Sequence, residues 1–193
     1  MVRSIRFSDD AFIDAAIGLV AEGGPAVATI AAIARRVGAP IGSIYHRFES
    51  RAAVLATAWS RIHGDFAARL LPLLEAGQDA EAALAIADWA REDLRRAQFL
   101  LLNESGVLLE DAPPERLLRE IAMQEEALDR AFLAGLARSG DPADPRHAAR
   151  ARFVIFDGPI ALLKPHLLAG VMPPAWVDRL ISALHETKMR SDG

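Results

Sequence analysis

The sequence predicts an all-α protein in which a small three-helix domain, residues 1–58, precedes a larger helical domain, residues 59–193. Apolar residues recur at helical spacing along each long segment, and short stretches rich in glycine and proline separate these segments. A hydrophobic content of 52% in 193 residues is enough to build a core. Cysteine is absent, which excludes disulfides and thiolate sites and suits a reducing cytoplasm.

The N-terminal residues outline a helix-turn-helix unit. A first helix is expected over about residues 8–22, because a serine and two acidic residues suit its start and "EGGP" stops it. A short second helix is expected between Thr29, its N-cap, and Gly38, which suits the left-handed turn after a helix. A third helix is expected at about residues 40–46, and a fourth begins near residue 51. Two short helices joined by a glycine-containing turn and braced by a longer helix are typical of this motif.

The outward face of the third helix is small and polar. At about 100° per residue, Ile44 and Phe48 share a face that packs on the second helix, whereas Gly42 and His46 point the opposite way. Between residues 29 and 51 four arginines stand against one acid, in a chain whose net charge is −4. Such a face can approach DNA closely and hydrogen-bond its bases or phosphates. The alternative is a solvated face on a small helical bundle.

The stretch "TIAAIARRVGAPIGSIYHRFESRAAVL" resembles the DNA-binding domain of the TetR (tetracycline-repressor) family of transcriptional regulators. The shared pattern runs from a threonine-led helix through a glycine turn to "G-[ST]-[LI]-Y-x-x-F" and a capped "[KR]-x-x-[LV]", and the match covers about residues 8–58. The resemblance implies that Thr29, Tyr45 and Arg51 contact phosphates. It also implies a homodimeric regulator that binds a pseudo-palindromic operator, with a repressor released by a small ligand as the expected mechanism.

The same resemblance makes Gly42 the residue that allows close approach to DNA. Pro40 and Arg51 depart mildly from the family pattern, in which small polar residues and lysine are frequent at these positions. The candidates for reading base edges are Ile41, Ser43 and His46. The full set expected at the DNA is Thr29, Pro40, Ile41, Gly42, Ser43, Tyr45, His46, Arg47 and Arg51.

Residues 59–193 would form the ligand-binding and dimerisation domain of such a regulator, giving about nine helices in the chain. The stretch "FDGPIALLKPHLLAGVMPPAW" resembles the family pattern in which the last two helices form the subunit interface, here residues 147–168 and 174–189. Apolar runs in the first of them exceed one amphipathic face, which independently favours burial against a partner. The helices are expected over Trp59–Leu74, Asp79–Asn103, Pro114–Arg138, His147–Leu168 and Pro174–Met189.

The effector site is expected where aromatic, methionine and isolated polar residues meet between helices, a common place for small-molecule sites. Such apolar residues are more often plain core. A buried Asp157 would orient a ligand hydroxyl or amine, or it would instead cap a helix break before Pro159. This lining favours a small, mostly apolar ligand. The ligand-binding candidates are Trp89, Phe99, Asn103, Met123, Phe156 and Asp157, with Phe66, Phe132 and His166 as weaker ones.

The sequence contains no motif that indicates catalysis, a cofactor or a metal. A phosphate loop, His-Glu-x-x-His, Gly-x-Ser-x-Gly and Glu-x-x-His are all absent. There is no signal-peptide core and no run of about 18 apolar residues, so we expect a cytoplasmic protein that does not span a membrane. Two alternatives stay open: a helical protein-interaction module, and a small helical enzyme with a carboxylate site such as Glu104 with Glu110 or Asp111.

Overall fold

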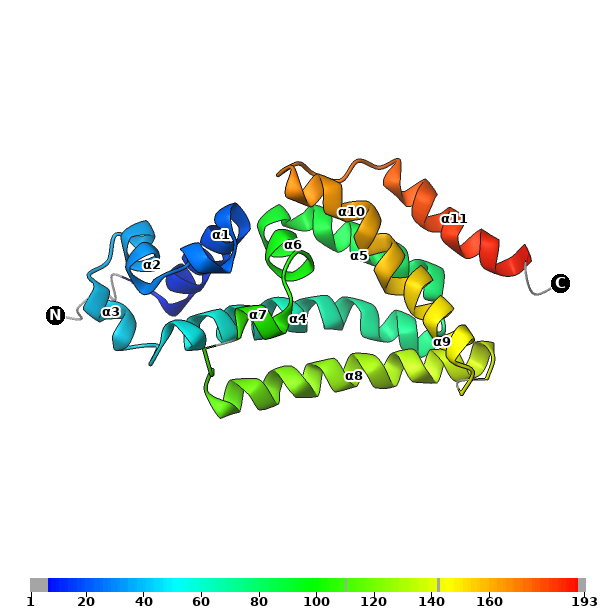
Figure 1. The fold of residues 1–193 in the computed structure, drawn as a ribbon, viewed down its shortest axis with the longest axis horizontal. Helices are drawn as coiled ribbons and strands as arrows, with labels where there is room; N and C mark the ends of the chain where they lie inside the picture. Colours follow the sequence, from blue (N-terminus) through cyan, green and yellow to red (C-terminus); the bar gives the residue numbers. More distant parts are fainter. Residues whose placement is uncertain (1–6, 110, 142, 191–193) are drawn as a thin grey trace. The chain divides into compact units, whose positions relative to one another are not determined.

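The computed structural model describes residues 7–109, 111–141 and 143–190, and in these residues the chain is all-α, as predicted (Figure 1). The chain divides into two compact units. The first unit comprises Met1–His63 and Gln98–Ala122, and the second comprises Gly64–Ala97 and Met123–Gly193. Glu110, named above with Glu104, lies outside the described residues. None of the described helices is both long and apolar enough to cross a membrane.

The first unit begins with the short helices that the caps predicted. The helix α1 (Asp9–Gly23) begins after Ser8, whose hydroxyl oxygen accepts a hydrogen bond of 3.1 Å from the backbone of Ala11. The short turn η1 (Pro25–Val27) leads to α2 (Ile30–Val37), which Thr29 caps in the same way. Gly38 follows with φ +71°, a left-handed conformation that glycine adopts readily. The local signals for these helices therefore predicted their bounds to within a residue or two.

The third helix, α3 (Ile41–Tyr45), is held by its inward face. Ile44 is fully buried and Phe48, just past the helix, is 7% exposed. Ile33 on α2 and Phe12 on α1 are also fully buried, and α1, α2 and α3 pack together. Burying such side chains stabilises the unit by about 1.5–3 kcal/mol each.

The fourth helix is longer than predicted. The start expected near residue 51 and the helix expected over 59–74 are one helix, α4 (Arg51–Ala76). The hydroxyl of Ser50 accepts a hydrogen bond of 3.1 Å from the backbone of Ala53 in its first turn. No glycine or proline lies between residues 51 and 63, so nothing in the sequence interrupts the helix there.

The single helix expected over 79–103 is wrong, because Asp93 breaks it. Asp93 has an extended backbone, φ −148° and ψ 103°, at the end of α5 (Asp79–Glu92). Its carboxylate accepts hydrogen bonds of 2.9 and 3.1 Å from the backbone of Arg95 and Arg96, in the first turn of α6 (Leu94–Leu101). An aspartate that caps a new helix ends the old one. The short helix α7 (Ser105–Leu108) and α8 (Glu115–Ser139) follow.

The C-terminal helices correct one expectation about Pro159. The chain runs without a break through α9 (Pro145–Arg152), a π-helical turn η2 (Phe153–Asp157) and α10 (Gly158–Leu168), so Asp157 caps no helix break. The backbone of Gly158 donates to the carbonyl of Phe153, five residues back, and Pro159 has no N–H to donate. The π turn therefore accommodates the proline within a continuous helix. The last helix, α11 (Val177–Arg190), begins later than the predicted residue 174.

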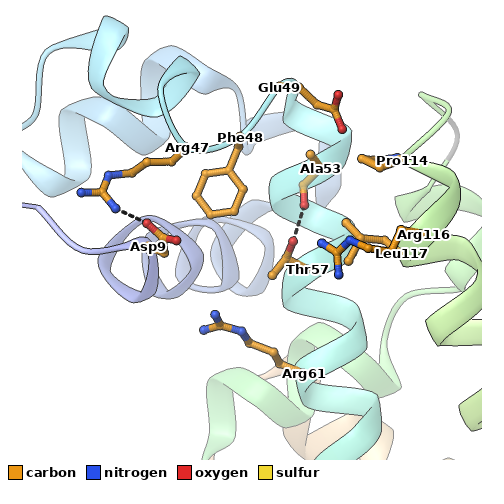
Figure 2. A pocket seen from close by; sticks show the side chains of 10 residues that line it. All are labelled: Asp9, Arg47, Phe48, Glu49, Ala53, Thr57, Arg61, Pro114, Arg116 and Leu117. Atoms are coloured by element: carbon orange, nitrogen blue, oxygen red, sulfur yellow. Dashed lines mark hydrogen bonds and ion pairs between the residues drawn. The ribbon is translucent and has the colours of Figure 1, made fainter.

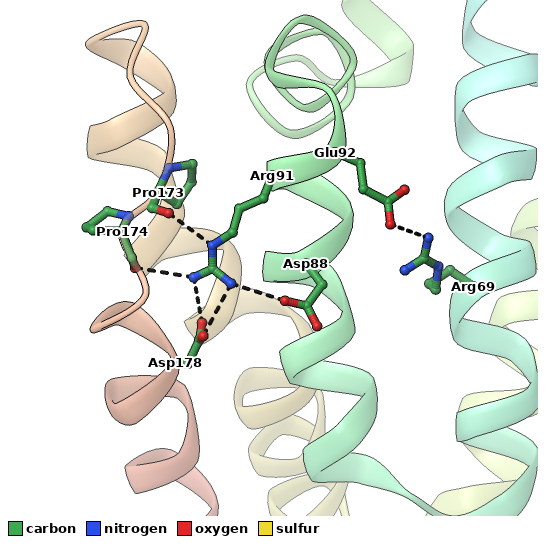
Figure 3. Close-up of polar contacts among 7 residues, drawn as sticks. All are labelled: Arg69, Asp88, Arg91, Glu92, Pro173, Pro174 and Asp178. Atoms are coloured by element: carbon green, nitrogen blue, oxygen red, sulfur yellow. Dashed lines mark hydrogen bonds and ion pairs between the residues drawn. The ribbon is translucent and has the colours of Figure 1, made fainter.

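One arginine fastens the start of α11 to α5 (Figure 3). Arg91 donates to the backbone carbonyls of Pro173 and Pro174 at 3.0 and 3.2 Å. It also donates to both carboxylate oxygens of Asp178, at 2.6 and 3.2 Å. These hydrogen bonds satisfy the carbonyl of Pro173 and give a second donor to the carbonyl of Pro174, which also accepts from the backbone of Val177 at 3.1 Å.

Candidate functional site

The outward face of α3 is presented to solvent on a buried support. Ile41 is 50% exposed and Tyr45 57% exposed, and His46 is exposed beside them. Gly42 faces open space, since a Cβ atom built there has no neighbouring atom within 4 Å. Ser43 is half-buried. These five residues form one accessible surface, which we call the α3 face.

Two residues before α3 contribute backbone geometry and a hydroxyl. Pro40 is the N-cap of α3, and its carbonyl accepts a hydrogen bond of 2.9 Å from the backbone of Ser43. Thr29 is exposed, and its hydroxyl oxygen accepts from the backbone of Ala32 at 3.1 Å. Because this bond uses an acceptor lone pair, the hydroxyl proton can still be donated to a phosphate.

Three of the four arginines counted as a basic patch, Arg36, Arg47 and Arg51, have acidic partners from elsewhere in the first unit. Arg47 pairs with Asp9 at the start of α1 (Figure 2). Arg36 pairs with Glu22, and the hydrogen bond that its guanidinium donates to this carboxylate raises the pKa of Arg36 above its ordinary value. Charge counting along residues 29–51 cannot find these partners, because they come from distant positions in the sequence.

Arg51 has three acceptors in the first unit. Its Nε donates to the carbonyl of Ala28 at 3.0 Å, and an Nη atom donates to the carbonyl of Pro25 at 2.6 Å. The other Nη atom donates to the carboxylate of Asp111 at 2.6 Å, and 26% of the arginine side chain is exposed. Arg51 thus joins the start of α4 to the segment before α2 and to the segment before α8.

A pocket of about 390 Å³ in the first unit is lined in part by Arg47 (Figure 2). Arg61 and Arg116 enter it together with Arg47, and their ion-pair partners are Asp10 and Glu120 respectively. The pocket is therefore lined by arginines that already have acidic partners. Its lining consists of Asp9, Arg47, Phe48, Glu49, Ala53, Thr57, Arg61, Pro114, Arg116 and Leu117.

The six ligand-binding candidates are divided between the two units and differ in burial. Phe99 and Asn103 belong to the first unit, and the other four belong to the second. Phe99 is fully buried, and the amide of Asn103 donates to the carbonyls of Gln98 and Phe99 at 3.3 and 3.0 Å, which caps the end of α6. The side chain of Asn103 therefore has a structural role at a helix end.

In the second unit, Trp89 is buried, Phe156 is half-buried, and Met123 and Asp157 are exposed. Trp89 is 3% exposed and its indole N–H donates to Asp65 at 2.9 Å. Phe156 is half-buried, with its ring edge-on to Phe132 at 5.9 Å. Met123 is 69% exposed, and the expectation that Asp157 is buried is wrong, since its side chain is 55% exposed and lies 4.0 Å from Arg152. The π turn places Asp157 on the outer side of a continuous helix.

The first helices of the chain match a known protein family. Residues 12–58 match the family model described as "Bacterial regulatory proteins, tetR family". Residues 12–58 are a DNA-binding domain of the TetR family. This family consists of DNA-binding transcriptional regulators rather than enzymes, which answers the carboxylate-enzyme alternative. A comparison with curated protein sequences gave no match.

Two solved structures share the TetR fold along nearly the whole chain. One is the fatty acid degradation regulator FadR from Bacillus halodurans, with a TM-score of 0.63 and 17% identity over 93% of this chain and 96% of that chain. The other is the transcriptional regulator FadR from Bacillus subtilis in complex with stearoyl-CoA, with a TM-score of 0.65 and 18% identity over 93% and 96% of the two chains. At this identity the likeness concerns the fold.

Sequence reasoning missed three buried residues just after the TetR match ends at residue 58. Trp59, Ser60 and His63 lie on α4, and each is at least nine-tenths buried. The ring of Trp59 stacks with that of His63 and tilts against Phe99. The signal that could have found them is a tryptophan, a serine and a histidine within one helical turn of otherwise alanine-rich sequence.

Proposed function

We propose that this TetR-family protein is a homodimeric repressor that binds a pseudo-palindromic operator and is released by a small, mostly apolar ligand. The accessible α3 face carries the proposal, because it offers base and phosphate ligands without exposing the core beneath it. Residues 1–58 would be the DNA-binding domain and residues 59–193 the ligand-binding and dimerisation domain. The proposed location is the cytoplasm, because a protein that binds an operator must be in the compartment that contains the DNA.

The proposed roles on DNA divide into positioning and reading. Thr29, Tyr45 and Arg51 would position the protein by contacting phosphates, with Arg47 beside them. Gly42 and Pro40 would let the start of α3 approach the groove closely. The residues that would read base edges are Ile41, Ser43 and His46.

Exposed apolar side chains on the last helices support the proposed dimer. Phe153 is 49% exposed, Leu168 67%, Trp176 49% and Leu180 43%. Several large apolar side chains exposed along these segments favour an interaction surface, and a second copy of the chain would cover it with residues 147–168 and 174–189. A two-fold dimer places two recognition helices about 34 Å apart, in successive major grooves. A ligand that prefers a different spacing weakens DNA binding by its differential affinity for the two states.

Stearoyl-CoA is the first ligand to test. It is the molecule bound in the Bacillus subtilis FadR structure, and its acyl chain matches the expectation of a mostly apolar effector. The coenzyme A part is highly charged, so we propose that the acyl part occupies the protein interior. Free coenzyme A is the control, and it should leave DNA binding unchanged.

The test of the proposed function is selection of bound fragments from the source genome. We expect recovery of a pseudo-palindromic sequence that binds far more tightly than a scrambled duplex in moderate salt. Affinity for both duplexes should fall steeply with salt, because phosphate contacts release counterions. Equal affinity for the two duplexes, or a monomer at micromolar concentration by light scattering, would contradict the proposal.

A further inference from the structure

The buried polar side chains of the described residues gather on one stretch of α4. Ser60 is 2% exposed and His63 is 9% exposed, and no other polar side chain in the described part of the chain is classed as buried. Trp59 precedes them and is 5% exposed. Within the first unit, a tryptophan, a serine and a histidine side chain are thus buried together on α4.

The indole N–H of Trp59 is buried without an acceptor. No hydrogen-bond partner for this atom exists among the described residues. The hydroxyl of Ser60, by contrast, donates to Glu120 at 2.6 Å, and the indole N–H of Trp89 donates to Asp65 at 2.9 Å. Native proteins rarely leave a buried donor unsatisfied. Where the protein itself offers no acceptor, an ordered water or a ligand supplies one.

The surroundings of this N–H favour an uncharged acceptor on an apolar molecule. The ring of Trp59 stacks with His63, with centroids 6.4 Å apart and planes 12° apart. On the side of α6, Phe99 is fully buried, with its ring centroid 6.2 Å from that of Trp59. Burying an isolated charge beside such rings costs far more than burying a neutral carbonyl that accepts a hydrogen bond.

We propose that Trp59 is the polar anchor of the effector site, and that its indole N–H binds the carbonyl oxygen of an uncharged ketone, ester or thioester on a mostly apolar ligand. His63 and Phe99 form the aromatic wall for the ligand body. This inference rests on the proposed function, since it names the ligand chemistry of a ligand-responsive regulator. It replaces Asn103 and Asp157 as orienting groups, because the first caps α6 and the second is exposed.

The test uses a matched pair of probes and the indole signals of ¹⁵N-labelled protein. Acetophenone carries a carbonyl acceptor, and ethylbenzene has nearly the same shape without one. The chain has three tryptophans, so the Trp59 signal is assigned by its loss in Trp59→Phe. We expect acetophenone, but not ethylbenzene, to move this signal downfield, and to bind roughly tenfold more tightly than ethylbenzene.

The Trp59→Phe variant tests whether the preference for acetophenone depends on the indole N–H. Trp59→Phe keeps an aromatic ring and removes the donor, so the roughly tenfold preference for acetophenone should disappear. The control is Trp176→Phe, which changes an indole that is 49% exposed and should keep the preference. Three results would overturn the proposal: no response of the Trp59 signal to acetophenone, an equal response to both probes, or a preference that survives in Trp59→Phe.

Failure of this inference is separable from failure of the proposed function. Trp59→Phe should bind the selected operator as the unchanged protein does, because Trp59 lies outside the α3 face. Loss of sequence-specific DNA binding in the unchanged protein would contradict the repressor proposal and leave the probe measurements intact. A long-lived water that hydrogen-bonds the Trp59 indole, and that acetophenone does not displace, would overturn the anchor alone.

Discussion

Arg51 at the start of α4 donates a hydrogen bond of 2.6 Å to Asp111, which precedes α8. The side chain that the resemblance assigns to a phosphate therefore already has a carboxylate partner. Two further donors of the same guanidinium bind the carbonyls of Pro25 and Ala28. A DNA phosphate would have to compete with Asp111 for one Nη group, which makes this pair a point where the loop before α8 can influence DNA binding.

Asp111→Asn should strengthen DNA binding of the protein. Removing the carboxylate charge frees Arg51 for a phosphate, and we expect a few-fold higher affinity for any duplex with a salt dependence up to one unit steeper. Fluorescence anisotropy at several salt concentrations measures both quantities. Asp129→Asn removes the same charge from an exposed position on α8 and should change neither. Unchanged affinity in Asp111→Asn would remove Arg51 from the proposed phosphate contacts.

Gly42→Ala should separate folding from function. A Cβ atom at this position meets open space, and alanine favours a helix over glycine by up to about 1 kcal/mol, so the free energy of unfolding should stay the same or rise. Affinity for the operator should fall, because the added methyl group prevents close approach to DNA. The control is Gly106→Ala in α7, which is equally open and should not affect DNA binding. Full operator affinity in Gly42→Ala would show that the α3 backbone does not approach DNA closely.

Tyr45→Phe and His46→Ala should fail in different ways. Loss of the Tyr45 hydroxyl removes a proposed phosphate contact, so affinity should fall by a similar factor on every duplex. Loss of the His46 imidazole should cost about 1–3 kcal/mol at one base position and relax the preference there. Binding to the selected operator and to its single-base variants distinguishes the two patterns. If His46→Ala leaves both affinity and base preference unchanged, His46 is not a base-reading residue.

Arg91→Ala should lower the stability of the protein. The substitution removes the Arg91 donor from the carbonyl of Pro173 and the carboxylate of Asp178, and one of two donors from the carbonyl of Pro174. We expect a loss of about 1–3 kcal/mol in the free energy of unfolding. Urea denaturation followed by circular dichroism measures this loss. Arg95 is an exposed arginine, and Arg95→Ala should leave the denaturation midpoint in place. Equal midpoints for both variants would mean that the Arg91 contacts do not stabilise the start of α11.

The sequence predicted best where structure depends on neighbouring residues. Ser8, Thr29 and Gly38 act through hydrogen bonds and backbone angles within a few positions, and the first helices lie where these residues place them. It predicted less well where one side chain has two roles. Asp93 could be a surface residue of a long helix or the cap of a new one, and in the structure its carboxylate caps α6 by accepting from the backbone of Arg95 and Arg96.

Tertiary pairing explains what the sequence could not predict about the candidate site. The partners of Arg36, Arg47 and Arg51 lie 14, 38 and 60 positions away, so the local charge was overestimated. The acceptor-free indole of Trp59 is likewise a property of the packed core rather than of its sequence neighbours. Sequence composition and spacing identify these arginines and this tryptophan as candidates, and only the three-dimensional contacts show what each side chain binds.

The α3 face has a consequence for how regulators of this kind diverge. Ile44 and Phe48 are buried and hold the helix against the core, whereas Ile41, Gly42 and His46 are exposed to solvent. Substitutions on the outward side are therefore nearly neutral for folding, and a lineage can drift through many recognition surfaces without passing through unstable intermediates. The same independence makes this helix a suitable place for reprogramming operator choice by exchange of a few codons.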